Sequence, residues 1–230
     1  MRHTPARRRS LPVCLLLGLF AIVGVVRSPA EVSADEPSAE PAEVPATQPE
    51  SKPMAELELL TRAQWNAKPP VLEMTPHQVT AITIHHTATP QNFERDPGQT
   101  LRNLQAFSQR EDVLGNGKRK PAWADVPYHF YIAPNGVIVE GRDLGFQGDT
   151  NTRYDLHGQA QVVLEGNFME EQPTAEQLAS LHKLVIALCR QYDVPADRIR
   201  THRDRAEGQT SCPGDALQKE MEGLREMVGE

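Results

Sequence analysis

The strongest constraint on the fold is the order in which strand-like and helix-like patterns follow one another along the chain. Residues 79–85 alternate and are rich in β-branched side chains, which predicts a strand. Residues 97–111 place their apolar side chains on one face of a predicted helix. Residues 114–120, with two glycines and three basic residues, predict a loop. This mixed order favours an α/β sandwich with helices packed against one sheet.

The same mixture continues toward the C-terminus. Residues 128–132 and 137–140 flank a Pro-Asn-Gly turn and predict a β-hairpin. Residues 161–168 predict another strand. Thr174, with Gln177 three residues later, predicts the capping box of an amphipathic helix. A last helix is expected after the Cys-Pro-Gly sequence near the C-terminus.

The first 30 residues have the pattern of an export signal. Arg2 and Arg7, Arg8 and Arg9 precede an apolar run at about residues 11–26, and small residues near position 30 offer a cleavage site. The apolar run is shorter than the ~20 residues that a membrane-spanning helix needs, and an uncleaved anchor is the alternative. We therefore expect an exported protein, periplasmic or secreted, with no stable membrane insertion after signal cleavage.

Composition then separates a linker from a folded domain. Residues 31–56 are rich in Pro, Glu, Ala and Ser and contain no aromatic side chain, which predicts a disordered linker. A folded domain is expected at residues 57–230. Removal of residues 1–30, which hold five arginines and no acidic residue, changes the formal charge from −7 to −12. Such an acidic chain excludes nucleic acid as a partner, because nucleic-acid binding needs a basic surface.

Two segments carry residue types that bind metals. His85 and His86 end the first predicted strand, and adjacent side chains leave opposite faces of a strand, so one is expected to bind a ligand while the other packs or hydrogen-bonds. His202 and Cys212 are both zinc-ligand types, and Cys212 precedes a predicted helix N-terminus, which favours the thiolate. A histidine satisfied by backbone and a free cysteine are the alternatives. Cys189 falls in an apolar helix pattern, which predicts a core residue.

Several sequence blocks occur in an order that is typical of one family. They are Ile82-Thr83-Ile84-His85-His86-Thr87-Ala88, Val126-Pro127-Tyr128-His129-Phe130, Gly136-Val137-Ile138-Val139-Glu140-Gly141-Arg142, Gly166-Asn167-Phe168, His202-Arg203-Asp204 and Cys212-Pro213-Gly214. With these blocks, roughly residues 57–217 resemble the zinc-dependent N-acetylmuramoyl-L-alanine amidases, whose family includes phage lytic amidases and animal peptidoglycan recognition proteins. The resemblance implies a central mixed β-sheet flanked by helices in a single catalytic domain.

The resemblance also implies a metal site. It selects His85 rather than His86 as the first ligand of Zn²⁺, with His202 as the second and Cys212 as the third. Three protein ligands leave zinc one open position, as expected of a catalytic site, and a water bound there has a pKa of about 7. Non-catalytic relatives typically lose the cysteine, so Cys212 favours an active enzyme.

Further roles follow from the same resemblance. Tyr128 is expected to stabilise the oxyanion or orient the water, and Thr210 to assist by hydrogen bonding, because it stands where relatives carry a catalytic Lys or Thr. His129 and His86 are expected at the substrate groove. The alternatives are a strand aromatic for Tyr128, a turn residue for Thr210 and a structural histidine for His129.

Two departures from the family pattern limit these implications. One amidase branch carries a glutamate general base at a position that Val163 occupies in this chain. Glu165 lies two residues later, at a position that is usually not catalytic, so we favour a mechanism assisted by Tyr128. Asp143 and Leu144 replace the Gly-Trp pair of relatives that recognise diaminopimelate, so the stem-peptide preference does not follow from those relatives.

The implied function is zinc-dependent hydrolysis of the amide bond between N-acetylmuramic acid and L-alanine, with peptidoglycan or muropeptides as the substrate. Two alternatives remain. One is a module that binds muramyl peptide without cutting it, and the intact set of three ligands distinguishes the enzyme from such a module. The other is an endopeptidase that cuts within the stem peptide, which the released fragments would distinguish.

Overall fold

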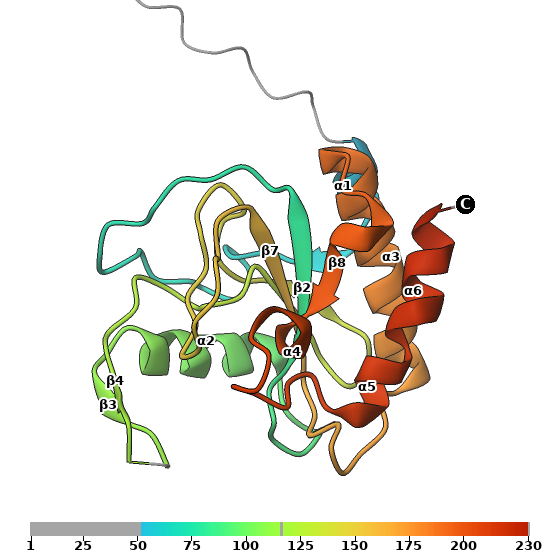
Figure 1. Cartoon of the computed structure of the whole chain (residues 1–230). Helices are drawn as coiled ribbons and strands as arrows, with labels where there is room; N and C mark the ends of the chain where they lie inside the picture. Colours follow the sequence, from blue (N-terminus) through green and yellow to red (C-terminus); the bar gives the residue numbers. More distant parts are fainter. Residues whose placement is uncertain (1–51, 116, 230) are drawn as a thin grey trace, which may run out of the picture. The chain divides into compact units, whose positions relative to one another are not determined.

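The computed structural model describes residues 52–115 and 117–229 of the chain (Figure 1). The predicted export signal at residues 1–30 and most of the predicted linker lie outside the described residues. The end of that linker differs from the prediction, because Lys52–Ala55 forms helix α1 and Met54 packs against the core. The folded part therefore begins before residue 57. Among the described residues, no helix has the length and apolar character needed to cross a membrane.

A mixed β-sheet lies at the centre of the described chain. Its six strands have the order β1-β6-β5-β7-β2-β8. They are β1 (Leu59–Leu60), β2 (Ala81–His86), β5 (Phe130–Ile132), β6 (Ile138–Glu140), β7 (Gln159–Leu164) and β8 (Ile199–Thr201). Strand β2 pairs in parallel with β7 and β8, and β5 pairs in parallel with β7. Strands β5 and β6 form the predicted antiparallel hairpin, and β6 pairs in parallel with β1.

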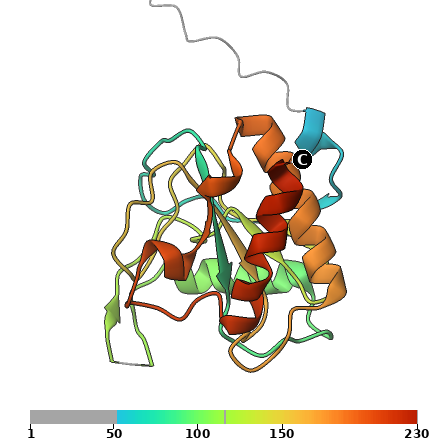
Figure 2. The same ribbon diagram turned by 45° about the vertical axis from the view of Figure 1, so that its right-hand side comes forward.

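Helices cover this sheet, as predicted. They are α2 (Pro97–Ser108), α3 (Ala175–Tyr192), α4 (His202–Arg205), α5 (Asp215–Lys219) and α6 (Met221–Gly229), with a 3₁₀ helix at Ala196–Arg198. Helices α3 and α6 lie side by side (Figure 2). Thr174 caps α3 with the predicted capping box, in which its hydroxyl accepts from the Gln177 amide.

Each face of the sheet has its own core. On one face, Ile82 and Ile84 of β2 pack in a cluster with Leu181 of α3, Leu217 of α5 and Leu224 of α6. Successive side chains of a strand point to opposite faces, so the other face is built from the alternate positions. All six residues of β2 and all six of β7 are buried, which is the pattern of parallel strands covered on both faces.

The second core lies under helix α2. Val163 of β7 and Tyr131 of β5 pack there with Leu101 of α2 and with Trp65. Asp96 caps α2 by accepting from the amide of Gln99, and the helix ends earlier than predicted. Because His85 follows Thr83 at the period of a strand, its side chain lies on this second face and not with Ile84.

The predicted loop at residues 114–120 differs from the structure in its last two residues. Strand β3 (Asp112–Val113) pairs in antiparallel fashion with β4 (Arg119–Lys120). Lys120 explains this, because its buried ammonium group lies over the rings of Phe107 and Trp123. The group donates hydrogen bonds to the carbonyls of Ser108, Arg110 and Pro121. Lys120, whose charge is typical of a loop in the sequence, is thus a buried residue that holds strand β4 in place.

The sheet topology brings the candidate functional side chains together at one edge. Strands β2, β5, β7 and β8 run in the same direction, so their carboxyl ends meet at the same edge. His85 and His86 end β2, Glu165 follows β7, and His202 follows β8 directly. Ligand sites in open α/β sheets lie outside the carboxyl ends of the strands.

Candidate metal centre

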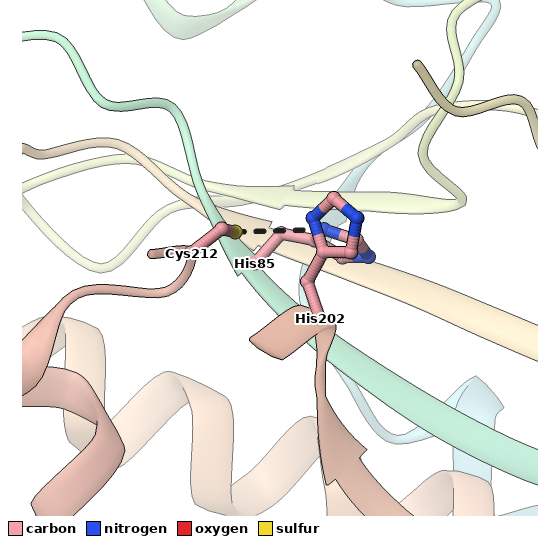
Figure 3. A group of neighbouring side chains, drawn as sticks. All are labelled: His85, His202 and Cys212. Carbon is pink, nitrogen blue, oxygen red and sulfur yellow. Dashed lines mark hydrogen bonds between the residues drawn. The ribbon is translucent and has the colours of Figure 1, made fainter. Parts of the chain in front are cut away.

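Three potential metal ligands come together at this edge (Figure 3). His85 reaches in from the end of β2, His202 from the first residue of α4, and Cys212 from the loop before α5. One donor atom from each side chain lies within 4.8 Å of the other two. The sulfur of Cys212 lies 3.7 Å from Nδ1 of His85, and the two imidazole rings have their centroids 4.7 Å apart. His85 thus forms one donor cluster with two residues that lie more than 110 positions later in the sequence.

Burial sets the protonation states of these groups. Burial lowers the pKa of His85 well below its ordinary value, with the charge of His202 as the next cause. Burial lowers the pKa of His202 to about 4. Both imidazoles are therefore neutral at neutral pH, which is the state that binds a metal. Burial raises the pKa of the Cys212 thiol to about 12, so a metal that binds there must displace its proton.

Main-chain groups hold Cys212 in place. The amide of His86 donates to the Cys212 sulfur at 3.3 Å, and the amide of Arg203 donates to the Cys212 carbonyl at 2.7 Å. The Thr210 hydroxyl oxygen accepts from the Cys212 amide at 3.1 Å, which uses a lone pair of that hydroxyl and not its proton. The sulfur thus faces the two imidazoles, and an amide dipole is available to a thiolate.

The donor set fits zinc. Two neutral imidazoles and one thiol are the nitrogen and sulfur donors that Zn²⁺ prefers, and three of them leave a fourth position open. Each imidazole also uses its second nitrogen. Nε2 of His85 contacts the side-chain oxygen of Gln161, and Nε2 of His202 lies 2.6 Å from the Thr152 hydroxyl. Outer contacts of this kind accompany metal-binding histidines.

Tyr128 lies beside the metal-ligand candidates. Its ring centroid is 5.2 Å from that of His85. Burial raises the pKa of the Tyr128 phenol, and the nearby Cys212 raises it further. The phenol therefore stays protonated and can donate a hydrogen bond near the cluster.

The two remaining histidines of the predicted site, His129 and His86, make hydrogen bonds with main-chain groups. His129 is 1% exposed; its Nε2 contacts the Phe146 carbonyl at 2.9 Å, and its Nδ1 accepts from the Gln161 amide at 2.8 Å. Both ring nitrogens are thus engaged with main-chain groups, and a substrate contact from His129 stays a prediction. His86 is also buried, and its Nδ1 accepts from the Phe168 amide at 3.3 Å. A substrate contact from His86 stays a prediction.

Val163 and Glu165, the two positions considered for a glutamate base, both lie in the interior of the fold. Val163 is fully buried in the core under α2. Glu165 is buried as well, where it accepts from the hydroxyl of Tyr131 and lies 3.5 Å from Arg95. Its oxygens therefore bind neighbouring side chains of the fold.

Sequence reasoning missed three residues that touch the ligand candidates. They are Thr152, Tyr154 and Gln161. Gln161 carried a signal, because a polar residue in a buried strand at the same face as Val163 needs a polar partner. Thr152 and Tyr154 lie between β6 and β7 in a segment without periodicity, so nothing in the sequence pattern marked them.

Acid is expected to destabilise the fold through His129. Burial lowers the pKa of His129 from 6.5 to about 3, so the unfolded chain takes up this proton first as the pH falls. The stability that His129 contributes is complete above about pH 6.5 and is lost as the pH falls toward 3. One pKa unit corresponds to about 1.4 kcal/mol, so the loss between pH 8 and pH 4.5 is about 3 kcal/mol.

Urea unfolding of the chelator-treated chain at these two pH values measures this loss. The variant His129→Asn keeps an acceptor for the Gln161 amide but does not titrate. It is expected to be less stable at pH 8 and to lose less stability on acidification. An equal loss in parent and variant would contradict the role of His129.

The fold and the cluster define a class of protein, an α/β domain with two histidines and one cysteine at the carboxyl edge of its sheet. The sequence model of the family described as N-acetylmuramoyl-L-alanine amidase matches residues 75–215. This range is more than half of the chain and includes all three ligand candidates. The chain belongs to that family.

Peptidoglycan recognition proteins are among the relatives of known sequence. Peptidoglycan-recognition protein SD of Drosophila simulans is 29% identical over 170 residues, covering 70% of this chain and 83% of its own length. Peptidoglycan recognition protein 1 of Mus musculus is 30% identical over 164 residues, covering 69% and 83%.

Solved structures agree with this assignment. The crystal structure of Drosophila peptidoglycan recognition protein SD matches with a TM-score of 0.59 at 28% identity, covering 71% of this chain and 92% of that chain. The N-acetylmuramoyl-L-alanine amidase LysCS from Clostridium intestinale matches with a TM-score of 0.54 at 23% identity, covering 72% and 93%. This second likeness is one of fold.

Proposed function

We propose that this protein is a zinc-dependent amidase that hydrolyses the bond between the lactyl group of N-acetylmuramic acid and L-alanine in peptidoglycan. The observation that carries the proposal is the convergence of His85, His202 and Cys212 within 4.8 Å, in a chain of the amidase family. A module that only binds peptidoglycan has no need of a buried thiol beside two neutral imidazoles.

The three candidate ligands would hold the metal with their neutral imidazoles and the Cys212 sulfur. Zinc bound by three protein ligands supplies a Lewis acid that acidifies water and polarises the scissile carbonyl. The chain's own groups prepare the site for it. Burial keeps both histidines uncharged, and the His86 amide donates to the sulfur, which favours the thiolate.

Tyr128 is the proposed donor to the oxyanion. As the scissile carbonyl becomes tetrahedral, negative charge develops on its oxygen, and a protonated phenol next to His85 can donate to that charge. Thr210 is a second candidate, because its proton remains available when its oxygen accepts from the Cys212 amide. Val163 and Glu165 supply no base to this mechanism, since one is apolar and the other is bound by Tyr131.

Relatives support the substrate class. The solved structure of peptidoglycan recognition protein LE, 27% identical with a TM-score of 0.59, is a complex with tracheal cytotoxin, a monomeric diaminopimelic acid-type peptidoglycan. We extend the class, muramyl peptide, to this chain and leave the stem-peptide preference open. The proposal includes export by the segment at residues 1–30, because peptidoglycan lies outside the cytoplasm.

Metal removal tests the enzyme against the binding module. Purified protein is incubated with purified cell wall before and after treatment with a zinc chelator, and new amino termini are counted. We expect cleavage by the untreated protein, loss of cleavage after chelation and recovery with added zinc but not magnesium. Binding to the wall without cleavage, in protein that contains zinc, would favour the recognition module instead.

A further inference from the structure

A short segment between β6 and β7 contacts the metal-ligand candidates from outside. The Thr152 hydroxyl lies 2.6 Å from Nε2 of His202. It also lies 3.0 Å from the hydroxyl of Thr150, whose oxygen accepts from the Thr152 amide. The Thr152 proton can therefore go to Thr150, which leaves a Thr152 lone pair for the N–H of His202. The ring of Tyr154 packs 5.3 Å from that of His202, centroid to centroid.

The same segment reaches His85 through Gln161. The side-chain oxygen of Gln161 contacts Nε2 of His85, and the Tyr154 hydroxyl lies 3.2 Å from that oxygen and 3.1 Å from the Gln161 side-chain nitrogen. The main chain of Gln161 is fixed from the other side, because it exchanges two hydrogen bonds with His129 at 2.8 and 2.9 Å. With its main chain held by His129 and its side-chain amide held by Tyr154, Gln161 keeps its side-chain oxygen against His85.

Gln209 ties the segment to the third ligand candidate. Its side-chain oxygen accepts from the Arg153 amide at 2.9 Å, and its side-chain nitrogen donates to the Arg153 carbonyl at 3.1 Å. Gln209 lies three residues before Cys212 in the same loop. Thr152 and Tyr154 thus contact His202 directly, and Tyr154 reaches His85 through Gln161. Arg153 is joined through Gln209 to the loop that carries Cys212.

We propose that Thr152, Arg153 and Tyr154, together with Gln161, form a positioning clamp that fixes both imidazoles with Nε2–H donated outward and Nδ1 turned toward the metal. This rests on the proposed zinc site. In His85, Nδ1 already faces the Cys212 sulfur while Nε2 meets Gln161. In His202, the Thr152 contact occupies Nε2 and leaves Nδ1 for the metal. The hydrogen bond at one imidazole nitrogen determines which nitrogen is free to bind a metal.

The clamp is distinguished from ordinary packing by what its removal changes. Outer-shell partners of metal-binding histidines typically contribute 10–100-fold in metal affinity. If Thr152 had only a structural role, its replacement would lower the free energy of unfolding and leave the affinity for zinc unchanged. The measurement is therefore the dissociation constant of zinc, obtained by competition with a chromophoric chelator.

Three variants of the full chain make the test. Thr152→Val removes the hydroxyl at almost constant volume, and Thr152→Ser restores it. The control is Thr174→Val, which removes a hydroxyl that caps α3 and donates to the Pro134 carbonyl at 2.7 Å, away from the cluster. We expect Thr152→Val to weaken zinc binding roughly 10–100-fold. Thr152→Ser and Thr174→Val are expected to bind zinc within about threefold of the parent.

Nitrogen NMR of the zinc-loaded chain adds a readout that does not depend on affinity. Long-range ¹⁵N–¹H spectra identify which imidazole nitrogen carries the proton, and the clamp predicts Nε2–H for His85 and His202 in the parent. Nδ1–H at either residue would overturn the proposal. Gln161→Met is expected to weaken zinc binding as Thr152→Val does.

The outcomes separate this proposal from the proposed function. If the parent binds zinc and cleaves peptidoglycan while Thr152→Val and Gln161→Met bind zinc as tightly as the parent, the clamp fails and the amidase stands. If the parent contains zinc but cleaves nothing, the amidase fails, and the affinity and NMR results still decide on the clamp. A parent that binds no zinc would contradict both.

Discussion

Replacement of Cys212 by alanine is expected to weaken zinc binding by about a hundredfold to a thousandfold and to reduce amide cleavage to background. Free energies of about 10–16 kcal/mol for zinc bound by four protein ligands put one ligand at about 2.5–4 kcal/mol. Once a metal has displaced its proton, Cys212 would supply the only negative charge among the three candidates, so its loss leaves the metal with two neutral imidazoles. Zinc content and affinity measure the first effect, and turnover on purified wall measures the second.

Cys189 provides a matched control. Both cysteines are free thiols and 7% exposed, but Cys189 belongs to the core cluster under α3, as the sequence predicted. Cys189→Ala is expected to lower stability through the cavity it leaves and to retain zinc and activity in the folded protein. If Cys212→Ala holds zinc as tightly as the parent, Cys212 is not a ligand.

Replacement of Tyr128 by phenylalanine is expected to lower kcat by about a hundredfold to a thousandfold while zinc content and zinc affinity stay unchanged. Loss of one donor to a developing oxyanion has effects of this size. The substitution keeps the ring that packs against His85 and removes only the hydroxyl. Steady-state kinetics on a soluble muramyl peptide, beside metal analysis of the same preparation, separates the catalytic effect from the metal effect.

Tyr192 serves as the control for this substitution. It lies at the end of α3, where it packs against the core away from the cluster. Tyr192→Phe is expected to leave kcat within about twofold of the parent. A Tyr128→Phe variant with parental kcat would remove Tyr128 from the mechanism and shift the oxyanion contact to another group, with Thr210 as the next to test.

The fold could be predicted largely from local patterns. Strand β2 and the β5–β6 hairpin carry β-branched residues and a Pro-Asn-Gly turn, and the capping box of Thr174 needs only two residues at fixed spacing. Each of these patterns involves residues only a few positions apart, so it can be recognised without knowledge of the tertiary structure. Element ends are less local: α2 stops at Ser108, where Lys120 binds the carbonyl of that residue.

The candidate site was predictable only in part. Residue types indicated His202 and Cys212, but the choice of His85 over His86 depends on which face of the sheet carries those two residues. The roles of Gln161 and His129 depend on partners 76 and 32 positions away, and no spacing rule links them. A sequence shows which side chains can bind metals, whereas tertiary contacts decide which nitrogen of an imidazole is free.

The measurement that tests the central claim most directly is the identity of the cleaved bond. Zinc-loaded protein is incubated with a defined muramyl peptide, and the products are analysed by mass spectrometry. The proposed function predicts free N-acetylmuramic acid with a lactyl carboxylate, and an intact stem peptide that begins with a free L-alanine amino group. Fragments cut within the stem, with L-alanine still joined to muramic acid, would contradict it.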